Sequence, residues 1–401
     1  MKWFYRCPAC ATTYDIRPGR YLCDVCAARQ QKERPLAGVL EVEWDGEWHG
    51  TPGYASAIPL PVEGRWFPPI PVGATPLWAP QRLRQEFAAP GLWLKDDTCN
   101  PSGSFKDRAS CLVAAFARQH GVDEIVLAST GNAASSMAAV GAAAGLRIKV
   151  FLPARAPLAK RIQVLQYGAE LVAVDGTYDQ AFDLSLEYST RTGALSRNTA
   201  YNPLTIEGKK TVAFEMLADL TRAGAGAPDH VFVPTGDGVI LAGVYRGFEN
   251  LLRLGRLTKM PTLWACQAEG SSAIARAYAA ALAAPGGDAF ANVVASATLA
   301  DSISVDVPRN GAHALAKLMK YGGRVVTVSD TEILAAQKKL ASSSGLFAEP
   351  SSSAAFAGWL KVRESIAADA TCVLLITGSG LKDVQAAARG LGIEPSPGEL
   401  S

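Results

Sequence analysis

The chain has 401 residues, 39 of them basic and 37 acidic, so its charges nearly balance. Nothing in this balance indicates a nucleic-acid or membrane-surface partner. No apolar run approaches the roughly 20 residues needed to span a bilayer, and residues 1–7 lack the uninterrupted apolar core of a signal peptide. We therefore expect a soluble, cytoplasmic protein of two or three domains that binds neither nucleic acid nor membrane.

Four cysteines near the N-terminus form two CxxC pairs separated by twelve residues: Cys7, Cys10, Cys23 and Cys26. Four thiolates at this spacing suit tetrahedral Zn²⁺ and leave no open coordination position, so the site would be structural. A disulfide pair is less expected without a secretion signal, and rubredoxin-like iron is the other metal that fits. We predict a zinc-ribbon-like module in residues 1–30, then a linker over residues 27–70 that wraps onto the main body.

From about residue 92, short β-rich runs alternate with Ala-rich helical stretches. The expected strands are 124–129, 148–153, 170–175, 230–234, 262–268, 324–329 and 371–377. The expected helices include 133–145, 177–191, 207–223, 239–254, 331–344 and 351–366. This alternation predicts an α/β fold with largely parallel sheets, in which ligands bind at the carboxyl ends of the strands.

One lysine, Lys106, lies between a turn rich in Gly, Pro and Ser and a helix whose apolar residues recur at helical spacing, among them Leu112, Val113 and Phe116. At a helix N-terminus the positive end of the helix dipole disfavours a second positive charge, which helps to keep an amine neutral and nucleophilic. Such a lysine is suited to forming a Schiff base. The alternative is an ordinary surface lysine in a first helical turn.

The stretch Asn100-Pro-Ser-Gly-Ser-Phe-Lys-Asp-Arg108 resembles the cofactor-lysine motif of fold-type II pyridoxal-phosphate (PLP) enzymes. Within this group, the tryptophan synthase β superfamily, it is most similar to threonine synthase and its relatives. The similarity covers most of residues 70 to 390 in the family's order. It continues through residues 73–77, 129–132, 206–211, 233–238, 349–351 and 377–383.

The resemblance implies an architecture. It implies two three-layer α/β domains with mainly parallel sheets, in addition to the zinc ribbon, with PLP in the cleft between them. The large PLP-binding domain would be built from residues 31–109 and 216–395, and a small mobile domain from residues 110–215. Because relatives are usually dimers, a homodimer is also expected.

The resemblance also assigns roles to residues. Lys106 would carry PLP and act as the general base, with Phe105 packing beside the cofactor. Asn132 would bind the ring oxygen of PLP, Thr377 its pyridine nitrogen, and Glu349 would order the pocket. The loop expected to hold the PLP phosphate comprises Thr235, Gly236, Asp237, Gly238, Val239 and Ile240. The segment expected to hold the substrate α-carboxylate comprises Ser129, Thr130 and Gly131.

The phosphate loop follows from physical chemistry as well, because glycines at a helix N-terminus leave backbone N–H groups free for an anion. A plain strand-to-helix turn is the alternative. Asp237 is repulsive beside a phosphate unless its side chain turns away. The loop is also one residue shorter than the P-T-G-N-F-G-D of threonine synthase.

The chain departs from threonine synthase where that family grips the phosphate of its substrate. The family patterns S-T-G-N-T, N-P-x-R-x-E-G-x-K-T and T-G-H-G-L-K carry Ala133, Thr205 and Ser379 here, and a family serine is replaced by Ala200. Loss of one charge-assisted contact costs about 1.5–3 kcal/mol. Three cations could compensate, although solvated surface positions are the simpler interpretation of each: Arg155, Lys209 and Lys210.

We therefore expect a PLP-dependent, threonine-synthase-like lyase or β-replacement enzyme. It would act on a small amino acid with a leaving group at the β-carbon, through an aminoacrylate or aminocrotonate intermediate. One alternative is true threonine synthase, which converts O-phospho-L-homoserine and water to L-threonine and phosphate. Another is a catalytically silent PLP-binding or interaction protein. The remaining cysteines, Cys99, Cys111, Cys266 and Cys372, are interpreted as core residues.

Overall fold

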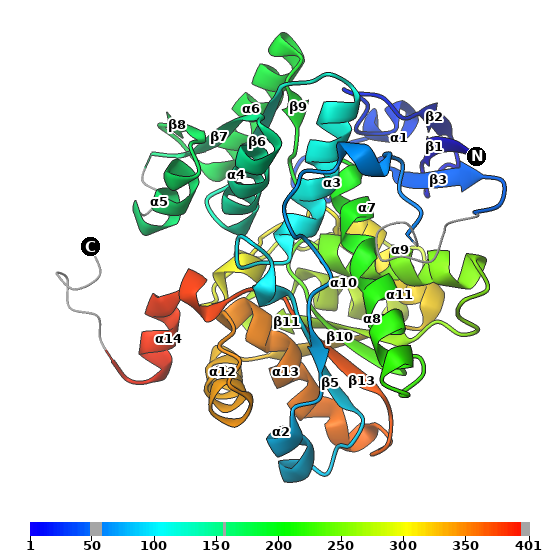
Figure 1. Ribbon diagram of the computed structural model, residues 1–401, viewed down its shortest axis with the longest axis vertical. Coiled ribbons are helices and arrows are strands. Elements are labelled where there is room, and N and C mark those ends of the chain that lie inside the picture. The colour runs from blue at the N-terminus through cyan, green and yellow to red at the C-terminus, as the bar shows by residue number, and fades with distance from the viewer. Residues whose placement is uncertain (49–57, 155–157, 394–401) are drawn as a thin grey trace.

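The computed structural model describes residues 1–48, 58–154 and 158–393 (Figure 1). Arg155 lies outside these ranges. No helix within them is long and apolar enough to cross a membrane. The described strands form three sheets, with strand orders β2-β1-β3, β12-β11-β10-β13-β5-β4 and β8-β7-β6-β9. The strands are β1 Lys2–Arg6, β2 Thr13–Asp15, β3 Glu41–Asp45, β4 Leu77–Trp78, β5 Leu92–Asp96, β6 Glu124–Ala128, β7 Arg147–Pro153, β8 Glu170–Val174, β9 Leu195–Ser196, β10 His230–Pro234, β11 Thr262–Ala268, β12 Arg324–Val328 and β13 Cys372–Ile376.

The helices alternate with these strands along the main body, as the sequence predicts. They are α1 Asp24–Ala27, α2 Gln81–Glu86, α3 Lys106–Gln119, α4 Asn132–Ala144, α5 Leu158–Gln166, α6 Tyr178–Thr192, α7 Leu204–Glu207, α8 Thr211–Arg222, α9 Val239–Arg253, α10 Ala273–Ala283, α11 Gly311–Tyr321, α12 Asp330–Ser344, α13 Pro350–Val362 and α14 Val384–Gly390. Capping boxes start two of the helices, Thr177 with Gln180 for α6 and Ser329 with Glu332 for α12.

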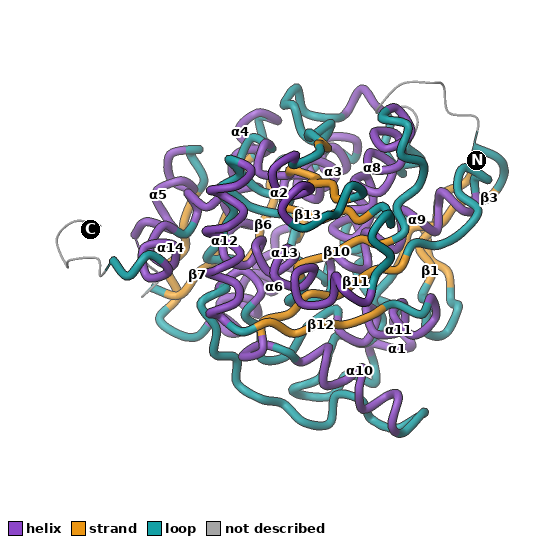
Figure 2. Tube along the Cα trace, turned by 90° about the horizontal axis from the view of Figure 1, so that it is seen from below, coloured by secondary structure: helices purple, strands orange, loops and turns teal. Residues whose placement is uncertain are grey.

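The six-stranded sheet is parallel except for its edge strand β4. Its side chains alternate between two apolar layers. Phe232 and Leu374 pack with α12 and α13, whereas Val231 and Val373 pack with α8 and α9. Because successive residues of a strand point to opposite faces, helices cover both sides of this sheet and make a three-layer unit. Figure 2 shows β10, β11, β12 and β13 side by side between these helices.

The four-stranded sheet is parallel throughout and has its own core. Ile125 and Leu127 pack with α3 and α4, whereas Val126 and Ala128 pack with α6 on the opposite face. In Figure 1 this sheet and its helices lie in the upper half and the six-stranded sheet in the lower half, with α3 between them. The α/β fold with mainly parallel sheets is thus confirmed.

The N-terminal unit differs from the expected linker. Strand β3 lies within the stretch interpreted as linker, yet it pairs along its whole length with β1. Trp44 on β3 is only 2% exposed and lies under the guanidinium of Arg253, 4.0 Å from its ring centroid. Tyr5 belongs to the same apolar cluster as α3. The N-terminal antiparallel sheet therefore extends to Asp45 and packs against the main body.

The interpretation of the remaining cysteines as core residues needs one correction. Cys111, Cys266 and Cys372 are buried, but Cys99 is exposed. Its thiol donates a hydrogen bond to the Asp96 carboxylate at 3.4 Å. It lies in the turn after β5, where the chain leaves the sheet, so its strand-like context misled the prediction.

Candidate active site

The residues next to Lys106 at the start of α3 are held by hydrogen bonds and ion pairs. Asp107 accepts hydrogen bonds from the backbone N–H and the hydroxyl of Ser102, at 2.7 and 2.5 Å. Arg108 donates to both carboxylate oxygens of Asp97, at 2.6 and 2.8 Å, and to Glu215 on α8. The Lys106 amine has no hydrogen bond or ion pair with the described residues. Its neighbours in the motif therefore fix the helix and leave the amine available.

The electrostatic surroundings of Lys106 favour its neutral form. Burial lowers the pKa of the Lys106 amine, and the nearby cation of Arg197 lowers this pKa further. Two acids, Glu349 and Asp237, act on the same pKa in the opposite direction. A lowered pKa raises the fraction of free amine, which is the form that attacks carbonyls and accepts protons.

A small cavity surrounds the Lys106 side chain and draws its lining from separate parts of the chain. The lining residues are Phe105, Lys106, Asn132, Pro234, Ile240, Ser302, Ile303, Glu349, Ser351 and Thr377. Five of the residues singled out from the sequence, together with Glu349, therefore meet here, although they span more than 270 positions of the chain. They lie where the two parallel sheets face each other across α3.

Asn132, at the first position of α4, joins the two halves of the cavity. Its amide donates to both oxygens of Glu349, at 3.2 and 3.0 Å, and to the hydroxyl of Ser302 at 3.3 Å. Burial raises the pKa of the Glu349 carboxyl, against the hydrogen bond from Asn132, which lowers it. Gly378 leaves room for this carboxylate, because a Cβ there would lie 2.5 Å from its Oε1. Glu349 thus orders Asn132 directly.

Thr377 follows the last residue of β13 at the carboxyl end of the sheet. Its backbone is fixed on both sides: its N–H donates to the Ser352 hydroxyl at 2.6 Å, and its carbonyl accepts from the Phe105 N–H at 2.8 Å. Its own hydroxyl has no hydrogen bond with a described residue, although the side chain is largely buried. The hydroxyl is therefore free for a ligand.

The loop from β10 to α9 has the features of a phosphate cradle. None of the backbone N–H groups from Gly236 to Ile240 donates to a described acceptor. Gly238 has φ +83°, and a Cβ at Gly236 would lie 2.7 Å from Ile303 Cα, so both glycines are required by the local geometry. Asp237 turns its Oδ1 towards the backbone N–H of Arg309, at 3.0 Å. The sequence-based objection to Asp237 is thereby removed, and the donors fit a phosphate.

The segment between β6 and α4 contains the residues expected to bind the substrate α-carboxylate. The Ser129 hydroxyl accepts the N–H of Gly131 at 3.2 Å, so this N–H is engaged within the turn. The N–H groups of Thr130 and Asn132 have no described acceptor. Because α4 begins here, these groups also lie at the positive end of a helix dipole.

Two cations were misjudged from the sequence. Lys209 and Lys210, interpreted as solvated surface residues, are completely buried. Lys210 forms an ion pair with Glu207, whereas the Lys209 amine donates, among the described residues, only to the carbonyl of Thr205, at 2.7 Å. Arg197, which was not singled out at all, is also completely buried, and its charge lowers the pKa of the Lys106 amine. Short polar segments without periodicity gave no sign of this burial.

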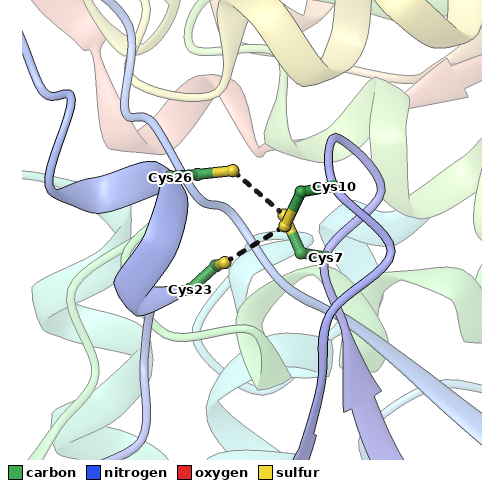
Figure 3. Close-up of side chains that lie close together, drawn as sticks. All are labelled: Cys7, Cys10, Cys23 and Cys26. Carbon is green, nitrogen blue, oxygen red and sulfur yellow. Dashed lines mark hydrogen bonds between the residues drawn. The ribbon is translucent and has the colours of Figure 1, made fainter.

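The four N-terminal cysteines come together as their spacing predicts (Figure 3). Their Sγ atoms all lie within 4.8 Å of one another. The pairs Cys7–Cys26 and Cys10–Cys23 are 3.7 and 3.5 Å apart, and all four thiols are free of disulfides. A tetrahedral Zn²⁺ with Zn–S bonds of about 2.3 Å would separate its sulfurs by about 3.8 Å. The cluster therefore has the dimensions of a four-thiolate metal site.

A half-buried lysine with a free amine at a helix N-terminus, beside a loop suited to phosphate and between two mainly parallel sheets, is the arrangement expected of a fold-type II PLP enzyme. A family model described as "Pyridoxal-phosphate dependent enzyme" matches residues 70–378. Threonine synthase from Methanocaldococcus jannaschii is 32% identical over 394 residues, covering 96% of this chain and 94% of that protein. Threonine synthase from Halalkalibacterium halodurans is 34% identical over 327 residues, covering 81% and 87%. The chain belongs to the family of pyridoxal-phosphate-dependent enzymes and is threonine-synthase-like.

Solved structures agree with this fold. The processed form of threonine deaminase isoform 2 from Solanum lycopersicum superposes with a TM-score of 0.65 at 22% identity, covering 79% of this chain and 87% of that one. A fungal L-serine ammonia-lyase from Rhizomucor miehei has a TM-score of 0.65 at 20% identity, covering 80% and 98%. At these identities the likeness concerns the fold.

Proposed function

We propose that this protein is a PLP-dependent lyase or β-replacement enzyme that acts on a small amino acid with a leaving group at the β-carbon. The observation that carries the proposal is the amine of Lys106, unbonded to any described residue, in one cavity with the unbonded hydroxyl of Thr377. PLP, when bound, supplies a ring that accepts electrons from the substrate Cα. A neutral hydroxyl does not hold the ring nitrogen protonated, which favours elimination and replacement over transamination.

Different residues of the site would bind different groups of the cofactor and the substrate. The N–H groups from Gly236 to Ile240 would hold the cofactor phosphate, and the amide of Asn132 would bind the ring oxygen. The free N–H groups of Thr130 and Asn132 would receive the substrate α-carboxylate. Lys106 would then take the proton from Cα and return it to a product or leaving group.

We further propose that residues 110–215 move as a small domain against a large domain of residues 31–109 and 216–395. The two separate apolar cores support this division. Lys382 spans the gap between the sheets: its amine donates to the hydroxyl of Ser135 on α4 and to the amide oxygen of Gln163 on α5, at 2.9 and 2.7 Å. Such contacts would hold the closed form and exclude water from the reacting Cα.

The decisive experiment replaces Lys106 with Ala in the PLP-loaded protein. Release of ammonia and 2-oxo acid from L-serine and L-threonine should fall by at least about 10²–10⁴-fold, the usual contribution of a general base. Borohydride should also no longer fix PLP to the chain. Lys361→Ala is the matched control, because this lysine forms only exposed ion pairs with Glu269 and Glu332. Fixation of PLP on another lysine would contradict the proposal.

True threonine synthase remains the second candidate, supported by the threonine synthase relatives. Phosphate release from O-phospho-L-homoserine, matched by threonine in the same tube, would establish it. The loss of the family's arginine at Thr205 and serine at Ala200 argues for little or no release. A PLP-loaded protein inert towards all these amino acids would instead indicate a binding protein.

We also propose that the four-cysteine cluster holds a structural Zn²⁺. Its dimensions and its lack of an oxygen or nitrogen ligand among the described residues support a closed thiolate site. A homodimer is proposed from the resemblance alone, and light scattering of the purified holoprotein would test it.

A further inference from the structure

A groove of about 760 Å³ lies between the N-terminal unit and helices α9 and α11 of the main body. We call it the interunit groove. Its lining comes from residues 6–11, 26–29 and 36–43 on one side and from 246–253 and 312–321 on the other. It shares no residue with the cavity around Lys106. Its volume lies within the roughly 300–1,000 Å³ typical of small-molecule sites, so it is a second candidate ligand site.

The carboxylates of the interunit groove are already paired with basic side chains. They are Glu41, Glu43 and Glu249. Each pairs with two or more basic groups at distances of 2.7 to 3.3 Å, and Arg246 pairs with all three. No carboxylate of the groove is therefore left to bind a cationic ligand.

Cations at the rim of the interunit groove are in excess. Arg6 and Arg29 of the N-terminal unit are exposed, and neither side chain has a hydrogen bond or ion pair with a described residue. Lys320 of α11 is 63% exposed and has only a 3.8 Å contact with Glu249 and a contact with the ring of Tyr321. In total six lysines and arginines line the groove against three carboxylates. Such a concentration of positive charge in a groove attracts an anion.

The rest of the lining is largely apolar, with one unsatisfied amide. Ala312 and Ala316 lie four residues apart and so share one face of α11, and the N-terminal unit adds Leu36 and Val39. Asn250 of α9 lines the groove and is only 2% exposed, yet its amide oxygen has no hydrogen-bond partner. A buried polar group is costly to leave unpaired. The lining therefore suits an anion with an apolar body and a hydrogen-bond donor.

One side chain of the interunit groove connects it to the cofactor loop. His313 has its Nε2 2.7 Å from Glu41 Oε1 and its Nδ1 3.2 Å from the amide oxygen of Asn310. The completely buried Asn310 donates its amide N–H to the carbonyl of Gly238 at 3.2 Å. Gly238 belongs to the loop whose N–H groups fit the PLP phosphate. A short hydrogen-bonded path thus joins the groove to that loop.

We propose that the interunit groove is an effector site for a small organic acid with an apolar body, and that its occupancy is coupled to the affinity for PLP. The free cations Arg6, Arg29 and Lys320 would hold the acid group and so tie the N-terminal unit to α11. His313 and Asn310 would then hold the phosphate loop in its binding geometry. Preorganisation of a binding loop raises affinity, so the acid should tighten PLP binding. This inference concerns the cofactor and does not depend on which reaction the enzyme catalyses.

The first test is a calorimetric titration of the holoprotein with indole-3-acetate and indole-3-acetamide, two probes of nearly equal shape of which only the first is charged. The wild type should bind the acid about tenfold more tightly than the amide or better, the effect of at least one charge-assisted hydrogen bond. The double variant Arg6→Gln/Arg29→Gln should lose most of this preference and keep its affinity for the amide. Arg17→Gln is the matched control, because Arg17 is an exposed arginine of the N-terminal unit outside the groove. Equal affinities for the two probes in the wild type, or a preference that survives the double substitution, would overturn the inference.

The second test measures the coupling. Because coupling between two binding sites is reciprocal, the acid should bind the PLP-loaded protein about fivefold more tightly than the cofactor-free protein or better, and should lower the Kd of PLP by the same factor. His313→Phe keeps a ring but removes both nitrogen contacts, so it should retain the charge preference and lose the coupling. An acid that bound in the phosphate loop instead would be weakened by PLP. That result, equal affinities for the two forms, or coupling that persists in His313→Phe would contradict the proposal.

Discussion

At Lys209 the fold buries an amine whose protonated form it disfavours. In the unfolded chain a lysine is protonated up to a pH of about 10.4, whereas burial and two neighbouring cations lower the pKa of Lys209 in the folded protein. The unfolded state therefore binds more protons between the two pKa values. Stability falls as the pH is lowered through that window and recovers as the pH rises towards the unfolded pKa.

We therefore expect Lys209→Met to raise the free energy of unfolding of the cofactor-free protein at pH 7. The gain should be about 1.4 kcal/mol for each pH unit of the pKa shift that lies above pH 7, because a folded-state amine whose pKa lies below 7 is already neutral at that pH. It should shrink as the pH approaches 10. Urea denaturation at several pH values measures this difference. Lys259→Met, at an exposed lysine, should change little, and a Lys209→Met protein that is less stable than the wild type at pH 7 would show that the charge has a partner.

The residues of the site differ in how visible they are in the sequence. Lys106, Asn132 and Thr377 stand at boundaries between a strand, a glycine turn and a helix, where local pattern indicates exposed functional groups, and the cavity contains all three. Arg197 and Lys209 carry no such pattern. Their burial depends on contacts with α3, such as that of Arg197 with Ser110, 87 positions away. From the sequence alone, a charged residue in a short polar segment is interpreted as a surface residue unless its long-range partner is known.

A network of buried charged side chains fixes the first turn of α3. Arg108 lies between the carboxylates of Asp97 and Glu215, and all three side chains are at most 1% exposed. Removal of one partner of a buried ion pair leaves the other charge desolvated and uncompensated. Arg108→Gln should therefore lower the free energy of unfolding by about 3–5 kcal/mol, as measured by urea denaturation.

The matched control is Arg147→Gln. Arg147 also bonds to an aspartate, Asp123, but the two side chains are 66% and 80% exposed. Exposed pairs contribute little because water screens them, so this variant should unfold almost as the wild type does. Equal effects of the two substitutions would mean that the Arg108 network does not hold α3.

Two of the expected strands were predicted to the residue, and the other expected strands differ from the observed ones by one or two residues at their ends. The strands 230–234 and 262–268 are β10 and β11 with unchanged bounds. Prediction of secondary structure failed where contacts with distant parts of the chain determine it. The expected helix 207–223 is observed as the end of α7, a 3-10 turn and α8. At Gly208 in this turn the backbone approaches α3, since a Cβ there would lie 2.4 Å from the Arg108 carbonyl oxygen. Strand β9 has only two residues, too few for a periodic signal.

At the scale of the whole molecule, a metal bound by the four-cysteine cluster would hold the N-terminal sheet against the main body. Cys7 and Cys23 are completely buried and belong to the same apolar cluster as Leu112 and Phe116 of α3. A metal held by four cysteines would thus tie the N-terminal sheet to the helix that starts at Lys106. Binding free energy of a structural metal is stability of the folded state, so its loss should loosen this attachment.

We expect one Zn²⁺ per chain by elemental analysis, and a lower melting temperature for Cys23→Ser than for the wild type. Catalytic turnover of the folded, PLP-loaded variant should persist, because none of the four cysteines lines the cavity around Lys106.

Cys99→Ser is the matched control, since Cys99 is exposed and outside the cluster. Because the four thiolates act together, chelation of the wild type should reproduce the melting temperature of Cys23→Ser and leave that variant unaffected. A metal-free wild type that melts at the same temperature as the metal-loaded protein would show that packing alone secures the N-terminal sheet.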